Sequence, residues 1–308
     1  MRIIVCTPGF DLNSGGTLVL DVIAHKLVES GLQVAFLMLA PIKLDSARWT
    51  LGLANQHIGS KVLRGIPVIN KNDLDQSSDI VIYPEVVFGN PCRASKVVRW
   101  LLNSPGKICA TQIDFVNELV IAHATHFIPE GMECAMPGAP DGNKINVLSL
   151  AYFDNTAVES YFDNAKERNV SVLVRKGLRY HATIPKFPDD WLNLDRLPFE
   201  DQLSEMAKSR YVISYDPYTM LSNYACLVGS KSIVVPIPGC SEEQWLPEIG
   251  RRTGIAYGIP ACKNMCWEAQ RRELLSDYSL IEERNTESIA TLIELMRTRF
   301  SWAGINLG

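Results

Sequence analysis

The chain has 308 residues, of which 47% are hydrophobic and 21% are charged, and this globular composition excludes a fibrous or wholly disordered protein. Thirty Lys and Arg residues against 34 Asp and Glu residues give a net charge of −4, which argues against general nucleic-acid binding because that requires a basic surface. At roughly 100–200 residues per domain, the length predicts two domains.

The sequence predicts a cytoplasmic protein. Its longest stretch without Asp, Glu, Lys or Arg, Pro217–Ser230, is far shorter than the ~20 apolar residues of a membrane-spanning helix. The short apolar run Ile3–Cys6 near the start does not resemble a signal peptide. Most of the eight cysteines lie in apolar runs, which is typical of reduced, buried thiols.

The first 150 residues predict alternating strands and helices. A strand at Ile3–Cys6, a turn at Ser14–Gly16, a helix over Thr17–Glu29 and an apolar run at Gln33–Leu39 form a βαβ unit, which indicates a parallel sheet. Further apolar runs predict strands at Asp79–Pro84, Lys107–Ala110, Leu119–Ile128 and Ile145–Leu150, a helix over Cys92–Asn103 and a loop over Pro129–Lys144.

The second half repeats this alternation. The patterns predict strands at Val170–Val174, Tyr211–Tyr215 and Ser232–Pro236, and helices over Phe199–Lys208, Thr219–Leu227 and Thr286–Phe300. We therefore predict an α/β protein with two Rossmann-like domains. These are residues 1–155 and 156–285, with a C-terminal helix at 286–308 that packs back on the first domain.

The Ser14–Gly15–Gly16 turn is the first candidate binding segment. Backbone amides at a helix N-terminus attract anions, and paired glycines allow a phosphate or sugar to approach the main chain closely. The segment has neither the Gly-x-Gly-x-x-Gly dinucleotide fingerprint nor the Walker A Gly-Lys-Ser/Thr sequence. A tight turn without a ligand explains it equally well.

Arg175 and Lys176 follow the predicted strand Val170–Val174 and form the second candidate. Ligands bind at the carboxyl ends of parallel strands, and two adjacent cations there suit a diphosphate. The alternative is a solvated basic turn.

Asp216, Thr219 and Ser222 form the third candidate, where the strand Tyr211–Tyr215 passes into a helix. The two hydroxyls are three positions apart and would share one helical face, where they could hold a phosphate. The alternative is that Asp216 caps the helix without a ligand. Glu85, which directly follows the predicted strand Asp79–Pro84, could bind a sugar hydroxyl or act as a base, or it could be an exposed loop carboxylate.

Several segments resemble glycosyltransferases of the GT-B fold, in particular family-4-like bacterial enzymes of cell-surface polysaccharide assembly. The resemblance rests on segments spread over most of the chain, namely Val81–Pro91, Val98–Gly106, Leu197–Leu203, Ser209–Asp216 and Leu227–Pro236. It implies two Rossmann-like domains that face each other across a cleft. The nucleotide-sugar donor would bind the second domain and the acceptor the first.

The resemblance and the candidate segments together suggest residue roles. Asp216, at the position of a family glutamate, and Glu85, at its strand end, would be catalytic, and Ser14 and Asn90 would contact the acceptor. Donor and phosphate contacts would come from the residues Gly15, Gly16, Arg175, Lys176, Thr219 and Ser222. Because Arg175 and Lys176 would neutralise the leaving diphosphate, no metal or other cofactor is expected.

The chain departs from the family at one pair of positions. The larger family carries two glutamates eight residues apart, and with Gly229 aligned to the family's glycine these fall on Asp216 and Tyr224. Asp216 could replace the first carboxylate, whereas Tyr224 cannot replace the second as an anionic ribose acceptor.

We therefore expect a glycosyltransferase of the hexosyltransferase class, acting on a glycan or lipid-linked acceptor. A lipid-linked acceptor would bring it to a membrane surface, although no basic amphipathic helix stands out. Two alternatives are a nucleotide-sugar epimerase of the same architecture and a catalytically silent nucleotide or glycan binder. The sequence does not determine the donor, the acceptor, the stereochemistry or the oligomeric state.

Overall fold

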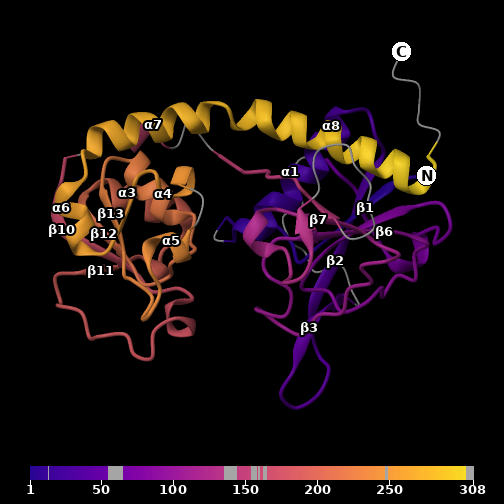
Figure 1. The fold of residues 1–308 in the computed structure, drawn as a ribbon, viewed down its shortest axis with the longest axis horizontal. Helices are drawn as coiled ribbons and strands as arrows, with labels where there is room; N and C mark the ends of the chain where they lie inside the picture. The colour runs from indigo at the N-terminus through magenta and orange to yellow at the C-terminus, as the bar shows by residue number, and fades with distance from the viewer. Residues whose placement is uncertain are drawn as a thin grey trace. The chain divides into compact units, whose positions relative to one another are not determined.

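A computed structural model describes residues 1–12, 14–54, 65–134, 144–153, 158, 160–161, 165–246 and 249–302. The chain divides into two compact units (Figure 1). Unit 1 comprises Met1–Tyr152 together with Ile281–Gly308, and unit 2 comprises Phe153–Leu280. The expected roles of the two domains, acceptor binding in the first and donor binding in the second, stay predictions.

Unit 1 contains one mixed sheet in the order β3-β2-β1-β5-β6-β7-β9-β8, with β4 also paired to β2. All pairings are parallel except that of β3, which forms an antiparallel hairpin with β2. The strands are β1 Ile3–Thr7, β2 Val34–Lys43, β3 Trp49–Leu53, β4 Val68–Ile69, β5 Ile80–Pro84, β6 Lys96–Leu101, β7 Leu119–Ala122, β8 Glu133–Cys134 and β9 Lys144–Val147. The helices are α1 Gly15–Glu29, α8 Ile281–Phe300 and the short 3-10 helices η1 Lys71–Asp73 and η2 Thr125–Phe127.

The two faces of this sheet are covered differently. Every residue of β1 and β5 is buried, as expected for strands of a parallel sheet that is covered on both sides. Ile3 and Val5 pack with α1 and α8 on one face. Ile4 and Cys6 point to the other face, which is covered by Val87, Cys92 and Ala94 from the connection after β5. This connection therefore covers the face of the sheet that a crossover helix usually covers in a βαβ unit.

The predicted helix over Cys92–Asn103 is wrong, because Lys96–Leu101 forms β6 in the middle of the sheet. Five of its six residues are buried, since β5 and β7 flank it and both faces are covered. A short apolar run of this kind has no periodicity that separates a central strand from a buried helix. The predicted strand Lys107–Ala110 is also wrong, because the segment forms turns that begin at Ser104, whose carbonyl accepts the Lys107 amide at 3.2 Å.

The remaining elements of unit 1 agree with the pattern in outline. The predicted first helix and its flanking strands are confirmed as β1, α1 and β2. The predicted strand Leu119–Ile128 ends at Ala122, and the predicted loop contains β8, while residues 135–143 lie outside the described part. The hairpin of β2 and β3 was not predicted, because turn residues interrupt its two apolar runs.

Unit 2 contains a parallel sheet in the order β11-β10-β12-β13-β14. The strands are β10 Arg168–Leu173, β11 Leu192–Asn193, β12 Ser209–Ser214, β13 Lys231–Val234 and β14 Ile255–Tyr257. The helices are α3 Phe199–Ala207, α4 Leu221–Leu227, α5 Glu242–Trp245, α6 Ile259–Asn264, α7 Trp267–Ser279, and the 3-10 helices η3 Gly177–Arg179, η4 Leu194–Arg196 and η5 Ile249–Arg252. The predicted strands and the helix over Phe199–Lys208 are confirmed, but α4 begins at Leu221 and not at Thr219.

A buried ion pair holds the connection after β5 against the sheet. The Arg99 side chain on β6 is fully buried, and its Nε and Nη2 atoms donate to the Glu118 carboxylate at 2.8 and 2.9 Å. Nη1 donates to the Val87 carbonyl at 2.9 Å and Nη2 to the Gly89 carbonyl at 2.7 Å. The guanidinium thereby satisfies backbone carbonyls of a connection that contains only turns and isolated β-bridges.

Removing Arg99 should destabilise unit 1 strongly. Arg99→Met would leave the Glu118 carboxylate and two loop carbonyls buried without their donor, so we expect a loss of about 3–5 kcal/mol in the free energy of unfolding. Urea denaturation measures this. Arg48→Met is the control, because the Arg48 side chain is 65% exposed and its pairing with Asp45 should contribute less than about 1 kcal/mol. Equal losses in the two variants would contradict the assignment.

Candidate functional site

The predicted functional residues lie where parallel strands end. In unit 1, Ser14, Gly15 and Gly16 follow β1 across a short loop, and Glu85 directly follows β5. In unit 2, Arg175 and Lys176 follow β10, and Asp216 follows β12. The carboxyl edge of a parallel sheet is where α/β proteins bind ligands, so each unit has its own candidate site.

Glu85 is buried at the carboxyl end of β5 and is only 3% exposed. Its main-chain amide donates to the Trp100 carbonyl of β6 at 3.0 Å, and its side-chain Oε2 accepts the Leu102 amide at 2.9 Å. The Thr111 hydroxyl donates to the Glu85 carbonyl at 2.5 Å. The main chain of Glu85 is thus fixed by two bonds and its carboxyl by one, and the buried carboxyl is not the exposed loop carboxylate considered from the sequence.

Burial controls the protonation of Glu85. Desolvation raises the pKa of its carboxyl to about 7, while the Leu102 amide and the positive charge of Arg99 act in the opposite direction. A carboxyl with a pKa near neutrality exchanges a proton readily at physiological pH, which is the property required of a general acid or base.

The N-terminus of α1 and the Glu85 carboxyl have a common neighbour, Leu102. A Cβ placed on Gly16 would lie 3.6 Å from Cδ1 of Leu102, the residue whose amide donates to Glu85. Gly15 is exposed, and Ser14 occupies the N-cap position without making a side-chain capping bond. Gly16 and Glu85 therefore share Leu102 as a neighbour, and a joint role of the turn and the carboxyl stays a prediction.

Asn90 has a structural role in the connection after β5. Its Oδ1 accepts bonds from the Tyr83 hydroxyl at 3.1 Å and from the Ala94 amide at 3.2 Å. Its Nδ2 donates to the Ala94 carbonyl at 2.8 Å. Because its amide group closes this loop, an acceptor contact through Asn90 stays a prediction with no support from the hydrogen bonding.

In unit 2, the backbone at Arg175 is held in an unusual conformation by Asp195. Arg175 has a φ of 42°, which residues other than glycine rarely adopt. The Oδ2 atom of Asp195 accepts the amides of Val174 at 3.0 Å and of Arg175 at 2.7 Å. Asp195 was missed from the sequence because it lies 20 residues away, on η4 after β11, and no local motif marks it.

This backbone brings Arg175 towards Asp216. Nε of Arg175 lies 4.0 Å from Oδ2 of Asp216, and the side chains are 17% and 4% exposed. The remaining Asp216 oxygen accepts the Tyr218 amide at 3.2 Å, so the aspartate also stabilises the turn after β12. Lys176 is exposed, and a Cβ on the following Gly177 would lie 2.8 Å from Cβ of Tyr215, so only glycine fits there.

The predicted pairing of Thr219 and Ser222 on one helical face is wrong. Thr219 precedes α4, and its hydroxyl accepts the Leu221 amide at 3.3 Å. Ser222 is 1% exposed, so its side chain belongs to the interior of unit 2. Tyr224 is equally buried, with its ring 5.5 Å from that of Phe199, and it therefore occupies the core.

The aromatic side chains around the Arg175–Asp216 pair complete this site. The rings of Tyr180 and Tyr218 lie 5.4 Å apart. Burial, reinforced by the negative charge of Asp216, raises the pKa of Tyr180 to about 12, so its hydroxyl stays protonated and can donate a hydrogen bond at neutral pH. The site thus offers cations, a carboxylate and tyrosine hydroxyls.

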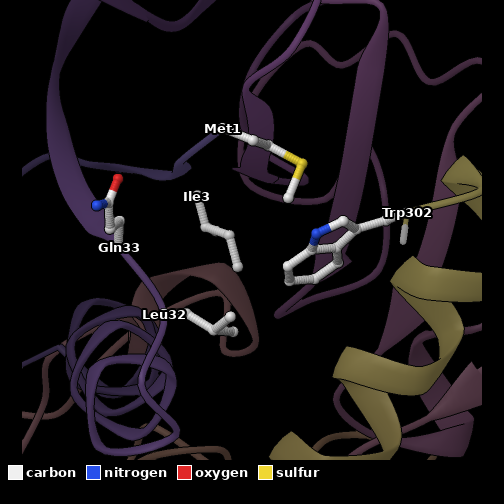
Figure 2. Close-up of a pocket in the computed structure, with 5 residues that line it drawn as sticks. All are labelled: Met1, Ile3, Leu32, Gln33 and Trp302. Atoms are coloured by element: carbon white, nitrogen blue, oxygen red, sulfur yellow. The ribbon is translucent and has the colours of Figure 1, made fainter. Parts of the chain in front are cut away.

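A pocket at the opposite edge of unit 1 lacks such groups. Figure 2 shows it between Met1, Ile3, Leu32, Gln33 and Trp302, at the amino ends of β1 and β2. None of these side chains titrates near neutral pH, so the pocket carries no chemistry of its own. Within the described residues, no cluster of three or more His, Cys, Asp or Glu side chains suits a metal ion, and none of the helices could cross a membrane.

Comparison with known proteins adds little. Neither a protein-family model nor a curated protein matches the chain. Among solved structures, a spinosyn rhamnosyltransferase, SpnG, matches with 11% sequence identity and a TM-score of 0.34, over 98% of this chain and 96% of that chain. A likeness this remote carries no argument about function.

Replacing Glu85 should change how stability depends on pH. The raised pKa means that the unfolded chain loses this proton first, so stability falls as the pH rises from about 4.5 to 7. Between pH 4.5 and 8, the wild type should lose up to about 3 kcal/mol relative to Glu85→Gln, measured by urea unfolding. The exposed Glu130→Gln variant should follow the wild type. Parallel curves for wild type and Glu85→Gln would refute the raised pKa.

Two variants of Asp195 distinguish the stabilisation that comes from its hydrogen-bond-accepting oxygen from the effect of its negative charge. Asp195→Ala leaves the Val174 and Arg175 amides without their acceptor, which should cost about 1–3 kcal/mol of unfolding free energy. Asp195→Asn retains an oxygen that accepts both amides, so it should cost less than half as much. Exposed Asp190→Ala is the control and should stay within about 0.5 kcal/mol. A similar loss for the Ala and Asn variants would argue against the amide contacts.

Proposed function

We propose that this protein is a glycosyltransferase that moves a sugar from a nucleoside diphosphate donor to a hydroxyl of a glycan or lipid-linked acceptor. One observation carries the proposal. The carboxyl edge of one sheet holds a carboxyl group with a pKa near neutrality, and that of the other holds an arginine in a fixed backbone conformation. A base can accept the proton of the acceptor hydroxyl, and a cation can stabilise the departing diphosphate, so both groups would assist sugar transfer.

The donor would bind unit 2. Arg175 would donate to the diphosphate oxygens, and the exposed Lys176 beside it would add a second positive charge. As the bond between the sugar's anomeric carbon and the phosphate oxygen breaks, these cations stabilise the charge that develops on the departing diphosphate. Asp216 would keep the guanidinium oriented and could accept a sugar hydroxyl.

The acceptor would bind unit 1. The Glu85 carboxylate would take the proton of the acceptor hydroxyl while the oxygen of that hydroxyl bonds to the anomeric carbon. The amides at the start of α1, beside Gly15 and Gly16, would position the acceptor or a donor phosphate. Assembly of surface polysaccharide, the hexosyltransferase class, independence of metal and a cytoplasmic location remain part of this proposal.

A silent binder is the second candidate, and the buried Tyr224 favours it. The family resemblance places a donor-binding glutamate at that position, whereas here the side chain lies in the core. Such a protein would bind a nucleotide without turnover. Donor consumption above background would exclude it, and conversion of the donor without any acceptor would indicate an epimerase.

Isothermal titration with UDP, GDP, TDP and CMP tests the proposal. At least one diphosphate should bind the wild type, and Arg175→Ala combined with Lys176→Ala should weaken that binding at least about tenfold, because two charge-assisted hydrogen bonds are lost. The control is Arg210→Ala combined with Lys231→Ala, which removes the same charges at the amino ends of β12 and β13. Binding of no nucleotide by folded protein, or an equal loss in both double variants, would overturn the proposal.

A further inference from the structure

The hairpin of β2 and β3 ends in a tip that projects from unit 1. Beyond Leu39, β2 pairs only with β3 among the described residues, so the last part of the hairpin is a two-stranded ribbon. Figure 1 shows the ribbon extending away from the rest of its unit. Every residue from 41 to 49 is exposed.

The tip is apolar although it is exposed. Ile42, Leu44 and Trp49 are 42%, 38% and 38% exposed, which makes three large apolar side chains within eight residues. Scattered single apolar residues are normal on a protein surface, but a cluster on a projecting element indicates an interaction site.

The apolar side chains occupy both faces of the ribbon. Lys43 lies directly opposite Trp49, and Ile42 lies directly opposite Thr50. Because directly opposite residues share a face and successive residues alternate, Trp49 and Ile42 point to opposite faces. A flat protein surface would cover one face only, whereas a lipid layer surrounds an inserted tip on all sides.

The charges of the tip also suit a lipid surface. Lys43 and Arg48 against Asp45 give a net charge of +1, and Arg48 Nε donates to the Asp45 carboxylate at 2.6 Å. Cationic side chains beside an apolar and tryptophan-containing tip are typical of segments that lie in the headgroup region of a bilayer. The Leu44 amide donates to the Arg48 carbonyl at 3.0 Å, and the Trp49 carbonyl accepts the Ala110 amide at 3.0 Å, so these backbone groups are satisfied within the protein when the tip enters the interfacial layer.

We propose that this tip, Ile42 to Trp49, inserts into the interfacial layer of a phospholipid bilayer. The stem of the hairpin is fastened beside the candidate site, because the Thr50 hydroxyl and the Leu51 amide both donate to the Val86 carbonyl, at 2.8 and 3.1 Å. Val86 follows Glu85. If the proposed function holds, the insertion brings Glu85 to a surface where a lipid-linked acceptor resides.

Vesicle sedimentation of the full-length chain tests the insertion, with vesicles of phosphatidylcholine alone or with 30% phosphatidylglycerol. The wild type should bind both, and the anionic vesicles about fivefold more tightly, as expected for one net positive charge. The triple variant Ile42→Ser, Leu44→Ser, Trp49→Ser should lose binding at least tenfold. Each of the three side chains is at least 38% exposed and lies outside the two sheet cores, so the variant should stay folded, with a thermal midpoint within about 5 °C of the wild type.

The matched control is Val116→Ser, Leu178→Ser, Ile259→Ser. These side chains are 77%, 69% and 61% exposed and lie outside the hairpin, so their loss should change vesicle binding less than twofold. Failure of the wild type to sediment with either vesicle, or an equal loss in both triple variants, overturns the proposal. So does a hairpin variant that loses self-association in size-exclusion chromatography while vesicle binding is unchanged.

Nucleotide titration without vesicles separates this inference from the proposed function. The hairpin variant should bind a nucleoside diphosphate as the wild type does, because Arg175 is unaltered. Vesicle binding by a wild type that binds no nucleotide would overturn the glycosyltransferase proposal and leave the membrane contact standing.

Discussion

A parallel sheet that is covered on both sides can present reactive side chains only where its strands end. In unit 1 the central strands β1 and β5 are buried throughout, and in unit 2 the last four residues of β10 are buried. Their polar groups therefore gather at the carboxyl edge, where the backbone turns towards the next element. Glu85 in unit 1 and the Arg175–Asp216 pair in unit 2 both follow from this constraint.

The unusual feature of unit 1 is how its second face is covered. No helix follows β5 before β6 begins, and a loop packs there, held by the guanidinium of Arg99 through the carbonyls of Val87 and Gly89. Glu85 is the first residue of this loop, and its carboxyl is buried beside the Leu102 amide. Burial outweighs the opposing charge of Arg99 and the Leu102 amide, which is why the pKa of Glu85 rises and does not fall.

In unit 2, hydrogen bonds to a distant aspartate fix the backbone of Arg175. Asp195 binds two successive amides and stabilises a backbone conformation that an arginine does not favour, and Gly177 lets the chain pass close to Tyr215. The arginine is thereby placed before any ligand arrives. Such preorganisation avoids the entropic cost of ordering a long side chain on binding.

The elements and residues that were predicted wrongly or missed depend on contacts between distant parts of the chain. The segment Lys96–Leu101 is buried on both faces because both faces of the sheet are covered, and its run of mostly apolar residues could equally belong to a buried helix. Thr219 and Ser222 have helical spacing, but the helix begins only at Leu221. The two hydroxyls therefore do not share a helical face. Asp195 left no signal at all, since its partners are 20 residues away.

Local apolar runs and turns in the amino-acid sequence were enough to predict the α/β class, most strands of both sheets, and the positions of Glu85, Arg175 and Asp216 at strand ends. The burial of Glu85, the hydrogen bonds between Asp195 and the Arg175 segment, the core positions of Ser222 and Tyr224 and the exposure of the hairpin tip became visible in the folded chain. Burial and long-range hydrogen bonds arise from segments distant in the chain, and no local pattern encodes them.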